Sequence, residues 1–378
     1  MRQNFGDEAK KAFEGGRIAQ AEQLLLKALA IHPTEPLYNL LARLLWLENR
    51  QSEFEKLCNS LLTDPVFCFC GVELLRQAEQ YDQALNALAA LPTDHRQNIR
   101  FFLNAAWIYI QLGDGQRAHQ CALPAFEAQN SEASADAYVS SLIMMGDFEK
   151  AEQILAALMA DEAHQGRWMA YQLHVDRILY PEKDGDYKGL IKVLNLQERH
   201  PRLYESGFSA ALRDAVEEIY RFKNHPLDQS LTGGQQTAAN LVNAEAPVLR
   251  QYLKMVSQEV KEYCRLSGDK KKFFNGNSFD HISIKECWSV TLDGGHHRPH
   301  FHPEGVVSGT YYLTVPGGTE KGTIYFGVPP FSTAVVPAPF FEYEPQEGSL
   351  ILFPSYFWHG TRKSAAGESR QTLPFDAG

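Results

Sequence analysis

Near residue 300 the chain gathers the side chains most able to do chemistry. Four histidines fall within seven residues there, directly after a strand-like run: His296, His297, His300 and His302. A further histidine, His359, and an arginine, Arg370, follow downstream. The neutral imidazole of histidine is the commonest metal ligand among protein side chains. The cluster therefore predicts a metal site carried by β-strands.

The spacing within this cluster selects two of the histidines as ligands. In a strand, residues i and i+2 point to the same face, so His300 and His302 would enter the site together while Phe301 points away. A third ligand must come from a second strand, and His359 follows the strand-like run 349–354. Three imidazoles can hold Fe(II), although ligand softness alone would equally suit Cu or Zn.

Two neighbouring features leave the third ligand open. Glu304 is an alternative carboxylate ligand to His302, although Pro303 interrupts the strand between them. His296 and His297 belong to a Gly-rich stretch, so we expect a turn there with both side chains in solvent. The predicted metal site thus contains His300 and His359, completed by His302 or by Glu304.

A separate group of residues could bind a carboxylate. Eleven residues after His359, Arg370 begins the last expected strand. The guanidinium group is always charged, and its planar fork binds a carboxylate through two parallel hydrogen bonds. Thr372 would lie on the same strand face, since it is two residues further on. Of Tyr311 and Tyr312, alternation allows only one to face inward.

The elements that must position these residues are short strands in the C-terminal part of the chain. Runs rich in β-branched and aromatic residues are separated there by Gly and Pro clusters, which predicts an all-β barrel or sandwich. The expected strands are 282–284, 288–292, 310–315, 323–328, 349–353 and 371–375. An amphipathic helix over 246–266 precedes them, because its apolar residues recur at helical spacing.

The N-terminal part repeats itself with a period near 34 residues. A turn residue stands five positions before an anchor residue, and the anchors recur at Ala21, Phe54, Ala84, Ala118 and Ala151. This period is typical of helix-turn-helix repeats of the tetratricopeptide type. Gly16, Gly113 and Gly146 would end the first helix of their pairs in the left-handed conformation. Such solenoids commonly receive a peptide or protein segment; packing on the rest of the chain is the alternative role.

These patterns divide the chain into three parts. The length of 378 residues exceeds the usual size of one domain. Helical character continues beyond the repeats, and a turn-rich stretch with a Gly pair then marks a boundary. We predict a multidomain protein: an all-α tetratricopeptide-like solenoid (1–167), a helical linker region (168–235), and an all-β double-stranded β-helix, or jelly roll, with a preceding helix (236–378).

Composition excludes several classes of protein. The net charge is −10 and the pI near 5.7, which argues against a nucleic-acid binder, since such binding needs a concentrated basic surface. No apolar run approaches the roughly 20 residues that cross a bilayer. Residues 1–11 are polar and unlike a secretory signal, and the six scattered cysteines fit reduced, buried thiols. We therefore expect a cytoplasmic protein.

Taken as one ordered set, the C-terminal motifs resemble the Fe(II)/2-oxoglutarate-dependent oxygenases, closest to their prolyl-4-hydroxylase-like branch. They are similar to a bacterial and phage group of such proteins, which often carries tetratricopeptide repeats. Most of the superfamily has Asp or Glu where this chain has His302, but that smaller group tends to share the histidine. The resemblance covers about 224–375 and rests on the segments 225–231, 300–303, 308–313 and 353–355, with His359 and Arg370.

The resemblance implies a cofactor, a cosubstrate and their ligands. Fe(II) would be chelated by 2-oxoglutarate, whose oxidative decarboxylation would drive the oxidation of a substrate, most commonly a hydroxylation. The residues implied are, for the metal, His300, His302 and His359 and, for 2-oxoglutarate, Arg370, Thr372 and Tyr312. The barrel would position and shield these groups, while the chemistry itself belongs to the metal and the cosubstrate.

Three functional classes follow from these residues. The first is an oxygenase that hydroxylates a peptide or protein side chain presented by the repeats. The second is a non-catalytic scaffold that binds a metal or a 2-oxo acid. The third is a cupin-like metalloenzyme that does not use 2-oxoglutarate, and Arg370 speaks against it because such an enzyme needs no fork for a distal carboxylate. The sequence leaves the substrate and the oligomeric state open.

Overall fold

The computed structural model describes residues 5–160, 165–183, 187–227, 229–267, 274 and 281–378. The chain forms two compact units. Unit 1 comprises Met1–Ile154, Pro226–Gln229 and Phe331–Val336. Unit 2 comprises Leu155–His225, Ser230–Pro330 and Pro337–Gly378. Within the part of the chain that is described, no helix is long and apolar enough to cross a membrane.

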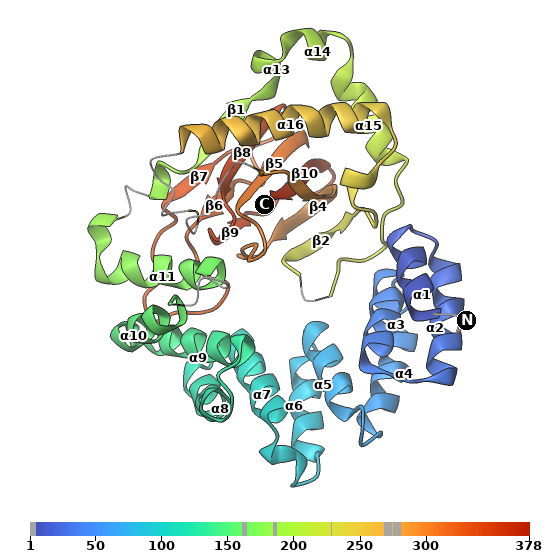
Figure 1. The fold of residues 1–378 in the computed structure, drawn as a ribbon, viewed down its shortest axis with the longest axis vertical. Coiled ribbons are helices and arrows are strands. Elements are labelled where there is room, and N and C mark those ends of the chain that lie inside the picture. Colours follow the sequence, from blue (N-terminus) through green and yellow to red (C-terminus); the bar gives the residue numbers. More distant parts are fainter. Residues whose placement is uncertain (1–4, 161–164, 184–186, 228, 268–273, 275–280) are drawn as a thin grey trace. The chain divides into compact units, whose positions relative to one another are not determined.

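Unit 1 is a stack of helix pairs (Figure 1). Successive helices from α1 to α9 contact one another, and so do the first helices of successive pairs, α1 with α3, α3 with α5, α5 with α7 and α7 with α9. This nearest-neighbour arrangement defines a solenoid and confirms the predicted tetratricopeptide-like region. The helices are α1 (Phe5–Glu14), α2 (Ile18–Ile31), α3 (Glu35–Leu47), α4 (Gln51–Leu62), α5 (Cys68–Gln77), α6 (Tyr81–Ala90), η1 (His95–Gln97), α7 (Ile99–Gln111), α8 (Gly115–Ala128) and α9 (Glu132–Met145), and α10 (Phe148–Leu158) begins in unit 1 and ends in unit 2.

The repeat is visible in the backbone as well as in the packing. The five anchor residues, Ala21, Phe54, Ala84, Ala118 and Ala151, all have 0% exposure. Five positions before each anchor the backbone has a positive φ, at Gly16, Asn49, Glu79, Gly113 and Gly146. After each of these residues, the next amide donates to a carbonyl five residues earlier, as Arg17 N does to Ala12 O. This is the left-handed helix end that the sequence predicts, here adopted also by two residues with side chains.

Unit 2 is an antiparallel β-structure in two sheets (Figure 1). The larger sheet has the order β1-β8-β5-β10-β4-β2, with β3 also paired to β10, and the smaller has the order β7-β6-β9. The structure thus confirms the expected all-β fold of the jelly-roll type. The strands are β1 (Lys192–Asn195), β2 (Leu231–Gln236), β3 (Ile284–Cys287), β4 (Val290–His297), β5 (Val307–Thr314), β6 (Ile324–Phe326), β7 (Phe341–Tyr343), β8 (Ser349–Pro354), β9 (His359–Thr361) and β10 (Arg370–Ala377).

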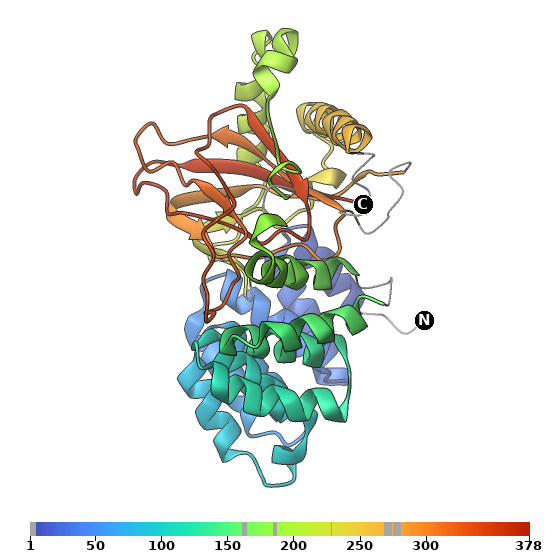
Figure 2. The same ribbon diagram turned by 90° about the vertical axis from the view of Figure 1, so that its left-hand side faces the viewer.

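Helices flank the sheets of unit 2. α16 (Pro247–Leu266) crosses the larger sheet in Figure 1 and lies to one side of it in Figure 2. The apolar face of this amphipathic helix packs on the sheet, and Tyr252 on that face donates a hydrogen bond to the carbonyl of Leu373 in β10 (3.3 Å). The other helices are α11 (Gln165–Leu179), η3 (Pro181–Lys183), α13 (Leu196–Arg199), α14 (Pro201–Glu205), α15 (Phe208–Glu217) and η4 (Leu241–Asn243).

Four short strands were not expected from the sequence. β1, and all of β2 except its last residue, lie within the range 168–235, predicted as a helical linker, yet both strands pair within the larger sheet, β1 with β8 and β2 with β4. β7 and β9 have only three residues each, too few to show an alternating pattern. The sheet therefore begins earlier in the chain than the boundary proposed at residue 236.

Candidate metal centre and buried arginine

Backbone pairing brings the histidines together. His359 begins β9, and a bridge joins it to His300: His300 N donates to His359 O (3.0 Å) and His359 N to His300 O (2.9 Å). Two residues on, His302 N donates to the carbonyl of Ser355 (2.9 Å), in the turn after β8. His300 and His302 thus lie in an extended segment, and their side chains point to the same face, as the i, i+2 spacing predicts.

The three side chains form a compact cluster. One ring nitrogen of each residue, His300, His302 and His359, lies within 4.8 Å of those of the other two. Among the residues that the structure describes, no other group of histidine, cysteine or acidic side chains reaches this density. Glu304, the alternative carboxylate ligand, is exposed and lies outside the cluster. The arrangement favours His302 over Glu304 as the third ligand.

Hydrogen bonds fix which nitrogen of each ring is available. Nδ1 of His300 lies 2.9 Å from the carbonyl of Arg298, and Nδ1 of His359 lies 2.9 Å from that of Phe357. Nδ1 of His302 lies 2.8 Å from Oδ2 of Asp376. Because these oxygens accept, each Nδ1 carries the proton, and Nε2 keeps its lone pair. Metal-ligating histidines are held by outer partners of this kind.

Burial disfavours the charged form of two of the imidazoles: it lowers the pKa of His300 to about 3, and it lowers that of His359 well below its ordinary value. For Asp376, burial raises the pKa, but the charge of His302 and hydrogen bonds from His302 and Ser308 outweigh it, so the pKa is lower than usual. The centre therefore offers three imidazole nitrogens with one carboxylate beside them.

Aromatic rings surround the cluster. The ring of Phe353 lies 4.7 Å from that of His359, and the ring of Phe326 lies 5.9 Å from it. On the other side, Trp288 stacks against His302 at 6.0 Å. These contacts hold the imidazoles in place and limit the access of water, which strengthens electrostatic interactions inside the site.

The expectation for His296 and His297 was wrong. Both belong to β4 rather than to a turn, and neither is fully exposed. His297 stacks on His300 at 5.8 Å, and its Nδ1 lies 3.1 Å from the hydroxyl of Ser230 in the segment before β2. Burial lowers its pKa well below the ordinary value. The Gly pair, Gly294 and Gly295, suggested a turn, but Gly295 instead allows the close approach of β2, since a Cβ there would meet Gly233 O at 2.3 Å.

Arg370 begins β10, as predicted, and is 2% exposed. Its Cζ lies 5.3 Å from the centre of the Tyr312 ring. Its Nε and Nη1 have no hydrogen-bond partner, and neither has the Tyr312 hydroxyl. Burial lowers the pKa of Arg370 and raises that of Tyr312 to about 12. Gly322 (φ +73°) makes room for the guanidinium, because a Cβ there would stand 2.6 Å from Nη1.

The predicted neighbours of Arg370 share its side of the sheet. Thr372 in β10 is paired in register with Tyr312 in β5, and both are buried. The neighbouring Tyr311 points the other way: its hydroxyl lies 2.9 Å from that of Tyr204 in α14. Alternation along β5 therefore selects Tyr312, and not Tyr311, for the pocket.

The residues present fit a metal and a dicarboxylic acid. Three imidazoles whose Nδ1 atoms face oxygens leave Nε2 available to a metal, which suits Fe(II); ligand type alone would also admit Cu or Zn. A buried guanidinium with unpaired donors costs free energy unless an anion pairs with it. The distal carboxylate of a 2-oxo diacid such as 2-oxoglutarate would supply that anion. The geometry thus supports the site residues expected from the sequence, which remain a proposal as ligands.

Sequence reasoning missed Asp376. It lies on the same face of β10 as Arg370 and Thr372, since the three positions differ by even numbers, and this periodicity could have indicated it. The isolated aspartate near the end of an expected strand carried no other signal.

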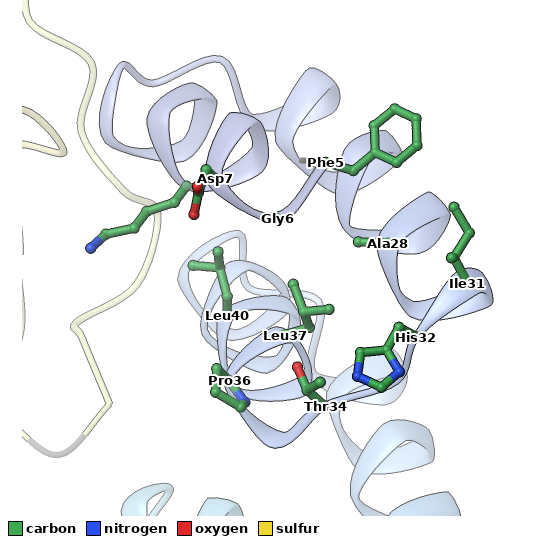
Figure 3. Close-up of a pocket in the computed structure, with 11 residues that line it drawn as sticks. Phe5, Gly6, Asp7, Ala28, Ile31, His32, Thr34, Pro36, Leu37 and Leu40 are labelled. Carbon is green, nitrogen blue, oxygen red and sulfur yellow. The ribbon is translucent and has the colours of Figure 1, made fainter. Parts of the chain in front are cut away.

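Unit 1 contains a cavity of its own. It has a volume of about 440 Å³ and lies among α1, α2 and α3 (Figure 3). Its lining is mainly apolar, with Leu37 and Leu40 on α3 and Ile31 at the end of α2. Ile31 is 72% exposed. Polar groups also line the cavity, from Asp7, Lys10 and His32.

The β-structure matches a known protein family, and the chain is similar to several solved structures. Residues 286–376 match the model of a family described as "Putative 2OG-Fe(II) oxygenase". The chain is similar to a Pseudomonas putida prolyl-4-hydroxylase (20% identity, 52% of this chain and 99% of that chain, TM-score 0.34). It is also similar to a viral collagen prolyl hydroxylase from Paramecium Bursaria Chlorella virus-1 (13%, 50% and 95%, TM-score 0.33) and to a tetratricopeptide repeat protein from Parabacteroides merdae (15%, 71% and 91%, TM-score 0.37). No curated protein matches the chain.

Proposed function

We propose that this chain, whose β-structure is a 2-oxoglutarate- and Fe(II)-dependent oxygenase domain by its family match over 286–376, hydroxylates a side chain of a peptide or protein. The observation that supports the site is the joint placement of three clustered imidazoles and a buried arginine with unpaired donors in the same β-structure. The match agrees with the oxygenase expected from the sequence. The substrate class and the ligand roles are our own inference.

Each residue has a defined part in this proposal. His300, His302 and His359 would hold Fe(II) through Nε2, with each Nδ1–H directed to an oxygen. Arg370 would pair with the distal carboxylate of 2-oxoglutarate, and the hydroxyls of Tyr312 and Thr372 would stand beside it. Bound together, Fe(II) and 2-oxoglutarate would allow O2 to act as the oxidant: decarboxylation of 2-oxoglutarate to succinate and CO2 takes up one oxygen atom, and the other would oxidise the substrate. The chain positions these groups and limits water.

The proposed substrate class rests on the repeats. Helix-pair solenoids offer many side chains at fixed spacing and commonly bind extended peptides. The cavity among α1, α2 and α3 has an apolar lining with an acidic and a basic group, which suits a peptide with an apolar side chain. The six cysteines of the chain are all free, which fits a reducing compartment, the cytoplasm.

The first experiment is an anaerobic titration of the metal-free protein with Fe(II) and 2-oxoglutarate. A visible charge-transfer band, which arises when a 2-oxo acid chelates Fe(II), would support both the metal and the cosubstrate. The same titration with His302→Ala tests the third ligand. Loss of the band supports a three-histidine site, whereas its survival would assign the third position to Glu304 or to water.

The other functional classes are distinguished in the same assay. If Fe(II) binds without the band, the cupin-like metalloenzyme is favoured and the oxygenase proposal fails. If the band forms but no succinate appears on admission of O2, the scaffold that only binds a 2-oxo acid is favoured. A screen of peptides that couple succinate release to their own oxidation would then identify the substrate.

A further inference from the structure

The three histidines are not held alike. Nδ1 of His300 and Nδ1 of His359 face neutral backbone carbonyls, whereas Nδ1 of His302 faces the carboxylate of Asp376 at 2.8 Å. Only one of the three imidazoles therefore has an anion behind it. A carboxylate acceptor makes the opposite ring nitrogen more basic and a stronger metal ligand than a carbonyl acceptor does.

Asp376 is itself held in position. Its Oδ1 accepts a hydrogen bond from the hydroxyl of Ser308, which is paired with Asp376 across β5 and β10. The hydroxyl of Ser355 lies 2.8 Å from that of Ser308, and the carbonyl of Ser355 receives the backbone N–H of His302. The carboxylate, its ligand partner and their supports thus form one closed hydrogen-bond network. Asp376 also lies close enough to act electrostatically on His300.

We propose that Asp376 is a positioning residue that completes the metal centre from behind His302. It holds the His302 ring with Nε2 toward the metal, and it gives the centre the negative charge that three imidazoles lack. A divalent cation on three neutral donors leaves a charge of +2 in a largely water-excluded site, and a carboxylate one ring away partly compensates it. The inference rests on the proposed function, because it takes the three histidines as ligands.

The first test compares two substitutions at this position by anaerobic calorimetric titration with Fe(II) alone. Asp376→Asn keeps an oxygen acceptor for Nδ1–H but removes the charge, and Asp376→Ala removes both. We expect the affinity to fall about 10- to 100-fold in the first variant and further in the second. Asp293→Asn removes a charge from an exposed position in β4 and serves as the matched control, with unchanged affinity.

A second test separates this role from a merely structural one. In His302→Asp no imidazole stands between Asp376 and the metal, so the part of the effect that acts through the ring is absent, and adding Asp376→Asn should lower Fe(II) affinity less than it does in the unaltered protein. The size of the effect of the same substitution thus depends on the residue at position 302. A loss of affinity by the same factor in both backgrounds would overturn the proposal, since it would show that Asp376 only supports the fold.

The outcomes also distinguish this inference from the function on which it rests. If the unaltered protein binds no Fe(II), the proposed function itself fails. If it binds Fe(II) and Asp376→Asn binds equally well, the function stands and the role of Asp376 is refuted. Should neither His302→Asp variant bind Fe(II), the comparison of Asp376→Asn with the unaltered protein decides alone.

Discussion

The two ends of the proposed site differ in how complete they are. At the metal end, every imidazole already has an oxygen acceptor at Nδ1, and one of these acceptors is Asp376. At the other end, six residues earlier on β10, Arg370 is buried with Nε and Nη1 unpaired. A buried charge without a partner costs on the order of several kcal/mol, so binding of an anion at Arg370 should stabilise this end of the site.

This difference indicates that the two ends of the site bind their ligands in different ways. The metal end is preorganised, since its donors are fixed in tautomer and orientation before any metal arrives. The arginine end stores an unsatisfied charge, which makes the affinity for a carboxylate high because binding relieves a cost already present. The two ends should therefore respond separately to substitution, and the following experiments test that independence.

The largest effect is expected at the metal end. His359→Ala removes one of three ligands, and we expect Fe(II) affinity to fall more than about 100-fold, beyond what loss of an outer partner costs. Anaerobic titration calorimetry measures it. His296→Ala, which alters a histidine outside the cluster, should retain full affinity. Retention of Fe(II) by His359→Ala would mean that the three histidines do not act as one site.

The next effect is expected at the arginine end. Arg370→Met should weaken 2-oxoglutarate binding by at least about 100-fold, because two charge-assisted hydrogen bonds are lost at ~1.5–3 kcal/mol each. Fe(II) binding without 2-oxoglutarate should be unchanged. Loss of both would show that the two ends are coupled and that the role of Arg370 is misassigned.

The free energy of unfolding of Arg370→Met provides a second test of the difference between the two ends. Without 2-oxoglutarate, Arg370→Met replaces an unpaired buried charge by an apolar chain, so its free energy of unfolding should rise, by about 1 kcal/mol or more. Denaturant unfolding of the protein free of 2-oxoglutarate measures this. A clear fall would mean that the unoccupied pocket is not strained by its charge.

A smaller effect is expected from the glycine beside the guanidinium. In Gly322→Ala the new Cβ would meet Nη1 of Arg370 at 2.6 Å, so the fork must shift and 2-oxoglutarate affinity should fall about 10-fold. Gly367→Ala is the control, since Gly367 has a similar positive φ but no atom within 4 Å of the added Cβ. Equal losses in both variants would assign the effect to backbone strain alone.

The smallest effect concerns the second donor. Thr372→Val removes a hydroxyl and keeps the shape of the side chain, so 2-oxoglutarate affinity should fall about threefold, in line with one neutral hydrogen bond. Competition with a 2-oxoglutarate analogue at fixed Fe(II) resolves a change of this size. An unchanged affinity would remove Thr372 from the pocket.

Much of this arrangement could be predicted from the sequence, for reasons that are local. The repeat could be recognised because Ala21 and its equivalents recur at intervals of 30 to 34 residues, and each follows a left-handed residue by five positions. His300 and His302 were readable because a strand alternates faces. Arg370 was found because it directly precedes the last run that was expected to form a strand, 371–375.

What the sequence did not show depends on contacts between distant segments. β9 is only three residues long, so its pairing with β6 comes from the tertiary fold and not from its own pattern. β2 contains Gly233 and Gly234, which read as a turn, yet these glycines permit its close approach to β4. The role of Asp376 can be recognised only from its contact with His302, which lies 74 residues earlier in the chain.

The position of β10 in the larger sheet has a consequence for biosynthesis. β10 lies between β4 and β5, although it follows both in the chain, and Arg370 pairs there with Leu292. During translation, β4 and β5 emerge from the ribosome well before the strand that joins them, so each keeps an open edge in the meantime. Such nascent edges are prone to wrong pairing, and contacts between distant residues form slowly. Barrel closure, and with it assembly of the whole site, thus waits for the strand that carries Arg370 and Asp376.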